Sequence, residues 1–250
     1  MSQFNHPAFD HYRQWLTGDR LPGIELLNAW ACQVDRTPAG ESLRFLHGQS
    51  SSAMQYETRI AEAGEVLMRP GSVHDIFNAL VWLAFPRTKT ALNAQHVTDR
   101  GNADGRRSRR RDAVTLLDES GLIVACADAT CAALLRAHAW RDLFVGHRED
   151  VVTKMRFVAC GHGLLAKMIA PFRAITGRAL LVPTDLVDLP DDATGWARID
   201  SAAARLVEVP DFGTSVLLPL PVAAVPGWDV ERLGERLFDD VSVFRHRVLR

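Results

Sequence analysis

Residues 72–96 constrain the fold more than any other part of the chain. Ser72, followed three residues later by Asp75, forms a capping-box pattern, which marks the start of a helix. Apolar residues then recur at helical spacing up to Pro86, and the residue before a proline rarely keeps a helical backbone. A helix is therefore predicted over residues 73–85, with one face committed to a hydrophobic core.

A second helix is predicted to follow directly, from about Thr88 to Gly101. Outside this pair, helical and alternating patterns succeed each other irregularly. We expect an antiparallel hairpin of residues 113–117 and 122–126 across the turn-forming residues 118–121. The other predicted helices are residues 7–48 in three pieces, 128–138, 164–169 and 199–207, and the other predicted strands are residues 54–60, 65–69 and 179–182.

Together these elements predict an α+β fold, in which a small mixed or mainly antiparallel sheet is packed by helices. We expect one domain over residues 1–250, with a helical N-terminal segment over residues 1–50 and a core over residues 51–250. A chain of this length buries roughly 70–75% of its unfolded surface, so it needs neither a metal nor disulfides to fold.

The composition argues against several classes of protein. The formal net charge of −1 gives no general attraction to nucleic acid or to anionic membranes. No apolar run approaches the roughly 18 residues of a transmembrane helix. The N-terminus lacks the basic and apolar segments of a signal peptide, so we expect a cytoplasmic protein.

The motifs of familiar metal and cofactor sites are also missing from the sequence. The four cysteines form no CxxC pair and no ligand spacing with histidine, which predicts reduced, buried thiols and assigns no metal ligands. The chain has no nucleophile elbow, phosphate-binding loop or dinucleotide fingerprint. The sequence therefore leaves the cofactor unknown.

His74 and Asn78 are the first candidates for a site, because residues four apart share one face of a helix. That face continues through apolar residues, so the two polar groups are predicted at the edge of the core or in a pocket. His74 lies in the first turn, where the helix dipole disfavours an imidazolium, and a neutral histidine there can act as a base or as a donor to substrate. In the structural alternative, the neighbouring aspartate caps the helix and His74 bonds a nearby carbonyl group.

Lys89, Asn93, His96 and Arg100 fall on one face of the second helix. In a functional interpretation, Lys89 binds a phosphate or carboxylate and Asn93 orients a polar group of the substrate. In the alternative interpretation, this face is simply the solvated side of the helix.

Three further groups of polar residues complete the set of candidates. His162 lies between two glycines, which let a ligand or another backbone approach closely, although a cap or a core hydrogen bond explains it equally well. Arg111 and Asp112 end a basic stretch that begins at Arg106 and that predicts an exposed loop, with one of the pair turned inward against the hairpin. The predicted turn alone accounts for Asp118-Glu119, which would need a pocket to act as an acid–base pair.

Several motifs in this chain match a known pattern. The longest runs from His74-Asp75 through Phe77-Asn78 and Trp82 to Phe85-Pro86, Lys89 and Asn93, and the others are Arg111-Asp112-x-x-Thr115, Asp118-Glu119-x-Gly121, Gly161-His162 and Pro226-Gly227-Trp228. Over about residues 50–245, the chain resembles the bacterial family catalogued as domain of unknown function 3025. The resemblance implies one full-length domain in the bacterial cytoplasm and assigns no reaction. One departure is Ala166, where the family pattern leads us to expect a glutamate.

From these residues we predict a site for a small anionic ligand, most simply in a hydrolase or a transferase. A first alternative is a non-catalytic binding or structural module, in which the same residues form a buried polar network. A second is nucleic-acid binding through Arg106–Arg111, which the lack of interleaved aromatic residues disfavours. Neither a membrane partner nor an oligomeric state is indicated. The predicted catalytic residues are His74, His162 and Asp112, and the predicted substrate-binding residues are Asn78, Lys89, Asn93 and Arg111.

Overall fold

The computed structural model describes residues 3–16, 18–33, 41–98, 108–185, 189–190 and 193–245. Its helices are η1 (Pro7–Tyr12), α1 (Ile24–Ala31), α2 (Ala53–Ala63), α3 (Val73–Ala84), α4 (Pro86–Thr98), α5 (Arg109–Ser120), α6 (Ala129–Ala137), α7 (Arg148–Lys154), α8 (His162–Lys167) and α9 (Ala193–Glu208). Its strands are β1 (Arg44–His47), β2 (Glu65–Met68), β3 (Gly121–Cys126), β4 (Met155–Ala159), β5 (Thr176–Pro183) and β6 (Leu217–Pro221). Short helical turns cover Asp142–Gly146, Thr214–Val216, Val222–Ala224 and Gly234–Asp239.

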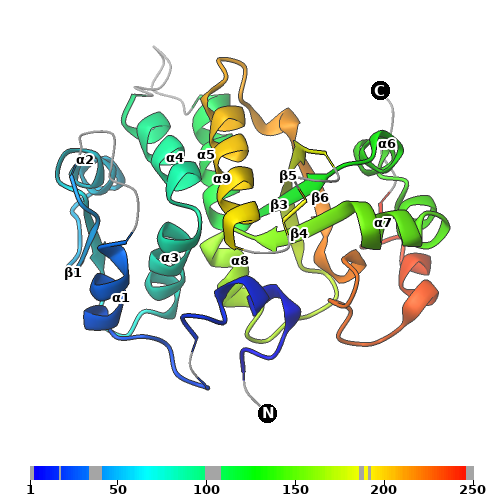
Figure 1. Cartoon of the computed structure of the whole chain (residues 1–250), viewed down its shortest axis with the longest axis horizontal. Coiled ribbons are helices and arrows are strands. Elements are labelled where there is room, and N and C mark those ends of the chain that lie inside the picture. The colour runs from blue at the N-terminus through cyan, green and yellow to red at the C-terminus, as the bar shows by residue number, and fades with distance from the viewer. Residues whose placement is uncertain are drawn as a thin grey trace.

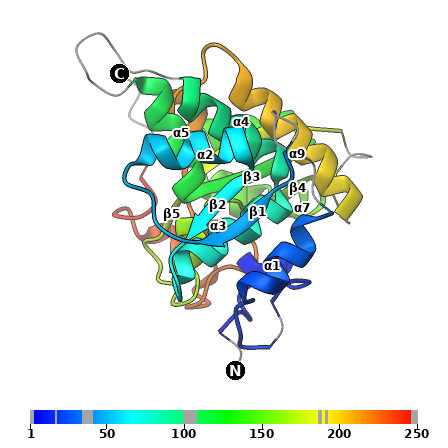
Figure 2. The same cartoon turned by 90° about the vertical axis from the view of Figure 1, so that its left-hand side faces the viewer.

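Two sheets lie on opposite sides of a layer of helices (Figure 1). The larger sheet has the order β4-β3-β5-β6, in which β3 and β5 are parallel and the outer pairs are antiparallel. The smaller sheet is the parallel pair β1-β2, joined by α2. Figure 2 shows this small sheet and α2 in front of the helical layer. The chain is therefore an α+β protein with small mixed sheets packed by helices, as the sequence predicts.

The central strand of the larger sheet illustrates why the sequence folds in this way. All six residues of β3 are buried, because β4 and β5 pair with its two edges and helices cover the sheet. A strand buried on both faces reads as a continuous apolar run rather than as an alternating pattern. The run Leu122–Cys126 meets that requirement.

One hydrophobic cluster extends from Phe4 near the N-terminus to Phe244 near the C-terminus. Phe9 stacks on Phe77 of α3, with ring centroids 5.7 Å apart, so the N-terminal segment packs on the helix that opens the central motif. This continuity supports our proposal of a single domain. Within the described residues, no helix combines the length and the hydropathy needed to span a bilayer.

The predicted helix pair is confirmed as α3 and α4. The Ser72 hydroxyl accepts a hydrogen bond from the backbone N–H of Asp75, as a helix cap should. The N-terminus of α4 is capped from another part of the chain. The Asp200 carboxylate, on α9, accepts hydrogen bonds from the backbone N–H groups of Arg87 and Thr88 at 2.9 and 2.8 Å.

The predicted strand over residues 54–60 is wrong, because these residues belong to α2. The helix is defined by its ends. The Ser52 hydroxyl accepts from the backbone N–H of Gln55, and Gly64 adopts a left-handed conformation with φ of 67° after the last turn. Both are strong helix-end signals that outweigh seven residues of alternation. Of the strand predicted over residues 65–69, residues 65–68 form β2, which pairs in parallel with β1 rather than with residues 54–60.

The predicted hairpin over residues 113–126 is also wrong in its first half. Residues 109–120 form α5, capped by the Ser108 hydroxyl, and the strand begins only at Gly121. Val114 and Leu117 are buried on one face of this helix, so the spacing that favoured a strand also fits a helical period. The residues assigned to the turn, Asp118 and Glu119, therefore lie in the last turn of a helix.

Two smaller expectations need correction. The segment over residues 1–50 was expected to be helical throughout, but it holds the strand β1 at Arg44–His47 besides η1 and α1. Residues 34–40 of this segment lie outside the described residues. Cys126, Cys131 and Cys160 are free and buried as predicted, whereas Cys32 is exposed.

Candidate functional site

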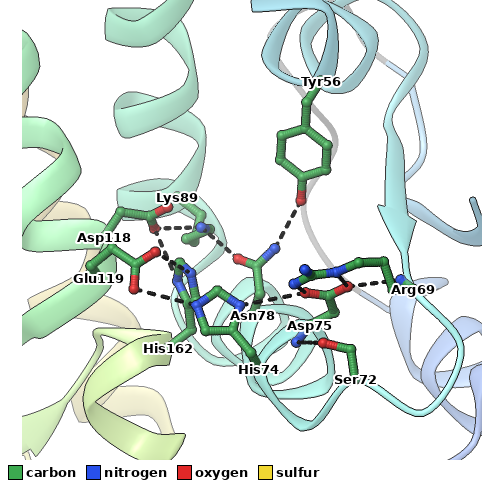
Figure 3. A network of polar contacts seen from close by, with 10 residues as sticks. All are labelled: Tyr56, Arg69, Ser72, His74, Asp75, Asn78, Lys89, Asp118, Glu119 and His162. Carbon is green, nitrogen blue, oxygen red and sulfur yellow. Dashed lines mark hydrogen bonds and ion pairs between the residues drawn. The ribbon is translucent and has the colours of Figure 1, made fainter. Parts of the chain in front are cut away.

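A cavity of about 490 Å³ opens where α2, α3, α5 and α8 meet beside β2. Its walls carry an unusual number of titratable side chains from elements far apart in the sequence. The residues that line it are Gly48, Gln49, Ser50, Ser52, Ala53, Tyr56, Glu57, Leu67, Arg69, His74, Asp75, Asn78, His96, Arg111, Thr115, Asp118, Glu119 and His162. Figure 3 shows the polar network on one side of this cavity.

Two histidines and a glutamate converge on one point of the wall. His74 comes from the first turn of α3, Glu119 from the last turn of α5, and His162 from the start of α8. The Nε2 atom of His74 lies 3.3 Å from Oε2 of Glu119, and the Nε2 atom of His162 lies 3.4 Å from Oε1. The two imidazole rings meet edge to face, with centroids 4.4 Å apart. We call these three residues the His–Glu–His cluster (Figure 3).

The cluster is shaped by close backbone approaches. A Cβ atom on Gly161 would lie 2.2 Å from the backbone nitrogen of Gly121, and a Cβ atom on Gly163 would lie 2.3 Å from the Glu119 carboxylate. Real Cβ atoms do not approach other atoms so closely, so both positions need glycine. The two glycines around His162 therefore allow close contacts, Gly161 with the backbone of Gly121 and Gly163 with Glu119.

Electrostatics within the cluster are dominated by its carboxylate. The contacts with His162 and His74 hold the pKa of Glu119 well below its usual range. In turn, the Glu119 hydrogen bond and the nearby Asp75 raise the pKa of His74. This shift runs in the opposite direction to the one that the helix dipole alone predicts for His74.

The second ring nitrogen of each histidine faces another carboxylate. Nδ1 of His74 lies 3.4 Å from Oδ1 of Asp75, and Nδ1 of His162 lies 3.8 Å from Oδ1 of Asp118. Both carboxylates are held by a cation: Arg69 binds Asp75 through two guanidinium contacts of 2.7 and 2.9 Å and through its backbone N–H, while Lys89 binds Asp118.

Behind the cluster lies a buried network centred on Lys89, which is 4% exposed. Its ammonium group donates to Oδ1 of Asp118 at 2.5 Å and to Oδ1 of Asn78 at 2.8 Å. Asn78 in turn donates to the hydroxyl of Tyr56, and the Lys89 ammonium lies 5.2 Å from the centre of the Trp82 ring. Burial raises the pKa of Asp118, but the charges of Lys89 and His162 outweigh it and hold that pKa below its usual range.

Glu57 is a partly buried carboxyl group on the α2 side of the cavity. Its Oε2 atom accepts a hydrogen bond of 2.7 Å from the Asn93 amide, and its backbone carbonyl accepts another of 2.9 Å. Burial and the charge of Asp118 raise the pKa of Glu57 to about 7. A carboxyl group that titrates near neutrality in a cavity is suited to proton transfer.

Arg111, on α5, adds a positive charge to the lining of the cavity. Among the described residues its guanidinium group has no hydrogen bond, and its Nε atom is buried without a partner. The preceding residue is used differently, because Arg110 donates to the carbonyl oxygens of Glu208, Val209 and Pro210 after α9. The basic stretch is thus partly helical and partly built into the fold, while Arg106 lies outside the described residues.

The structure brings most of the residues singled out in the sequence to this cavity. His74, Asn78, Arg111 and His162 line it. Lys89 and Asn93 lie directly behind its wall, both buried, so their face of α4 is not the solvated side of the helix. Asp112, predicted to be catalytic, lies in the first turn of α5 and is not among the lining residues. Arg100, grouped with the same face, lies outside the described residues.

Sequence reasoning missed two carboxylates of the site. Glu57 was hidden by the assignment of residues 54–60 to a strand, although the caps of α2 were visible. Glu119 was assigned to a turn, although the Ser108 cap and the spacing of Val114 and Leu117 indicate a helix.

The family model described as Protein of unknown function (DUF3025) matches residues 43–248. The chain belongs to this family. No curated protein and no solved structure matches the chain. The comparisons therefore assign no reaction, and a functional proposal must rest on the geometry of the cavity. The acid of the cluster comes from α5, so it does not depend on Ala166, where the resemblance leads us to expect a glutamate.

Proposed function

We propose that the cavity is the catalytic site of an enzyme that acts on a small anionic substrate, most simply a hydrolase. The observation that carries this proposal is the presence, in one cavity, of the His–Glu–His cluster, a carboxyl group with a pKa of about 7 and the Arg111 guanidinium group, whose buried Nε has no partner among the described residues. Titratable and charged groups of such different kinds rarely gather in one cavity wall that has only a structural role.

Each group has a role in this proposal. Arg111 binds the negative charge of the substrate, and the His–Glu–His cluster holds the reacting end. Glu57 accepts a proton from the attacking water and returns it to the leaving group, so one water is consumed and no other reactant is needed. Its pKa of about 7 suits both transfers.

Two roles suggested by the sequence change. Lys89 is fully engaged by Asp118 and Asn78, so it supports the cavity wall rather than the substrate. Asn93 holds Glu57 in place, because its amide donates to that carboxylate. Both are positioning residues in the proposed enzyme.

The rival proposal is a polar network with a purely structural role, which predicts different effects of substitution. In the enzyme, His74→Ala, Glu57→Gln and Arg111→Met should leave the melting temperature near or above that of the unchanged protein, because functional groups are commonly retained at some cost in stability. In a structural network, the same changes should lower the melting temperature sharply, because they leave buried partners unsatisfied.

Activity is tested on a panel of para-nitrophenyl esters, comprising a phosphomonoester, a phosphodiester and a monoester of a dicarboxylic acid. We expect hydrolysis of at least one ester, lost in Glu57→Gln and weakened through KM in Arg111→Met, whose charge contacts the substrate. Folded variants that hydrolyse the esters as fast as the unchanged protein would remove this cavity as the site.

A further inference from the structure

The distances within the His–Glu–His cluster do not suit hydrogen bonding alone. Good N–H···O bonds span about 2.7–3.2 Å, whereas Nε2 of His74 and Nε2 of His162 lie 3.3 and 3.4 Å from the Glu119 oxygens. Two ligand atoms that each lie about 2.1 Å from a tetrahedral metal ion are about 3.4 Å apart. The two observed separations, each to a different oxygen of Glu119, are close to that spacing.

We propose that His74, Glu119 and His162 bind a divalent metal ion. One ligand atom from each of the three residues can be chosen so that all lie within 4.8 Å of one another. Both histidines offer Nε2, and Glu119 offers one oxygen to each side. Three protein ligands leave coordination positions open toward the cavity, as in catalytic metal sites and unlike closed structural ones.

The surroundings of the ligands support the proposal independently. A metal-binding histidine usually donates its other ring N–H to a carboxylate, which fixes the tautomer and the ring orientation. Both histidines here have such a carboxylate on the Nδ1 side, Asp75 for His74 and Asp118 for His162. Nδ1 of His162 is buried and has no hydrogen bond among the described residues. Metal binding at Nε2 would leave the ring proton on Nδ1, where it would point toward Asp118.

The ligand set indicates the class of ion. Imidazole nitrogen together with one carboxylate suits Zn²⁺, Fe²⁺ or Mn²⁺, whereas Mg²⁺ and Ca²⁺ prefer oxygen ligands alone. When bound, such an ion acts as a Lewis acid and lowers the pKa of a coordinated water. This inference deepens the proposed hydrolase, since it names what the cluster holds, but metal binding can be measured without a substrate.

The test uses the full-length chain, stripped of metal with a chelator and titrated with Zn²⁺ by calorimetry, with Co²⁺ absorption as a readout of the coordination. Glu119→Gln and His74→Ala remove ligands whose side chains are 46% and 40% exposed, so these variants should fold. Glu57→Gln and His96→Ala are matched controls, because they make the same changes elsewhere in the same cavity. Circular dichroism and melting curves check the fold of every variant.

We expect one ion per chain in the unchanged protein and in both controls. Loss of a residue that hydrogen-bonds a metal ligand can lower the metal affinity by up to roughly 100-fold. Loss of a ligand itself should therefore lower the affinity by at least that factor. Absence of binding, or equal binding by the ligand variants, would overturn the inference. If metal binds as expected but no ester is hydrolysed, the metal site stands and the proposed hydrolase falls. If no metal binds but His74→Ala still abolishes hydrolysis, the hydrolase stands and the cluster transfers protons directly.

Discussion

Asp118 and Glu119 are neighbours in the last turn of α5, yet they serve two different regions of the same cavity wall. Asp118 points inward, is 17% exposed on its side chain, and is neutralised by Lys89. Glu119 points outward, is 46% exposed, and meets two histidines at distances too long for strong hydrogen bonds. In the inner region Asp118 has a close counter-ion, whereas in the outer region Glu119 has only long contacts with its partners.

The difference separates stability from function. Satisfied buried groups rigidify a fold, and removing one partner leaves the other unsatisfied in a medium of low polarity. Partly exposed, loosely contacted groups such as His74 and Glu119 add little stability, so another requirement must explain why they converge with the buried His162. We infer that the inner network holds α3, α4 and α5 in position, and that the outer cluster uses the positions thus fixed.

The largest effect is expected from Lys89→Met, which should lower the free energy of unfolding by about 3–5 kcal/mol. The substitution keeps an unbranched side chain beside Trp82, but it removes the ammonium group and leaves the Asp118 carboxylate without its cation. Urea unfolding at neutral pH measures the loss, and adding Asp118→Asn should recover much of it. A loss below about 1 kcal/mol would place this pair among surface ion pairs and erase the distinction between the two regions.

Glu57→Gln should raise stability in a pH-dependent manner. The folded-state pKa of about 7 lies above the ordinary 4.5, so the contribution of Glu57 to stability is full below pH 4.5 and is lost as the pH rises through 7. Above pH 8 the variant should be more stable than the unchanged protein by about 3 kcal/mol, because each unit of pKa shift corresponds to about 1.4 kcal/mol. The facing charges of Asp118, Lys89 and Arg111 are the same in both proteins.

Urea unfolding of the two proteins at pH 4 and above pH 8 makes this comparison. At pH 4 the two should have similar stability, because Glu57 is protonated there. An advantage of Glu57→Gln that does not change with pH would show that the carboxyl group is not held near neutrality.

Gly163→Ala tests the contact between α8 and the outer cluster. The new Cβ would lie 2.3 Å from Oε2 of Glu119 and 2.9 Å from its backbone oxygen, so Glu119 must move. We expect a loss of about 1–3 kcal/mol, as is typical of overpacking, together with loss of the cluster's function. Gly146→Ala is the matched control, because no atom lies within 4 Å of its added Cβ. Equal stabilities of the two variants would contradict the close approach.

His74→Ala should have the smallest effect on stability, within about 1 kcal/mol, because its contacts are partly exposed and long. Its effect on metal binding and on ester hydrolysis should nevertheless be among the largest. Thermal melting and calorimetry of this one variant therefore compare the two regions directly. A large fall in melting temperature would move His74 into the structural network.

How far the sequence predicts this structure can be seen in two helices. The α3 helix was predictable because local signals agree: the cap at Ser72, the apolar period and Pro86 all lie within one stretch. The α2 helix was not, because a short alternating pattern fits a strand as well as one face of a helix. There the caps at Ser52 and Gly64 decide, because the alternation over residues 54–60 does not distinguish a strand from a helix.

The composition of the site was predictable only in part, for a different reason. His74 and Asn78 are predictable from the apolar helical face that they share, His162 from its two flanking glycines, and Arg111 from its place at the end of a basic stretch. All three are local patterns. The convergence of His74 with Glu119, 45 residues later, depends on how α3 and α5 pack. The proposed metal ligands come from three separate elements and have no fixed spacing, so no sequence motif indicates them.

The cap of α4 bears on the order in which parts of the chain fold during synthesis. The carboxylate that receives the first N–H groups of α4 belongs to Asp200, which follows Thr88 by 112 residues. During synthesis, Lys89 therefore leaves the ribosome long before the residue that caps its helix. We expect nascent chains that end before Asp200 to hold an unfinished cavity, so that a stalled or cleaved product is inactive and open to proteolysis.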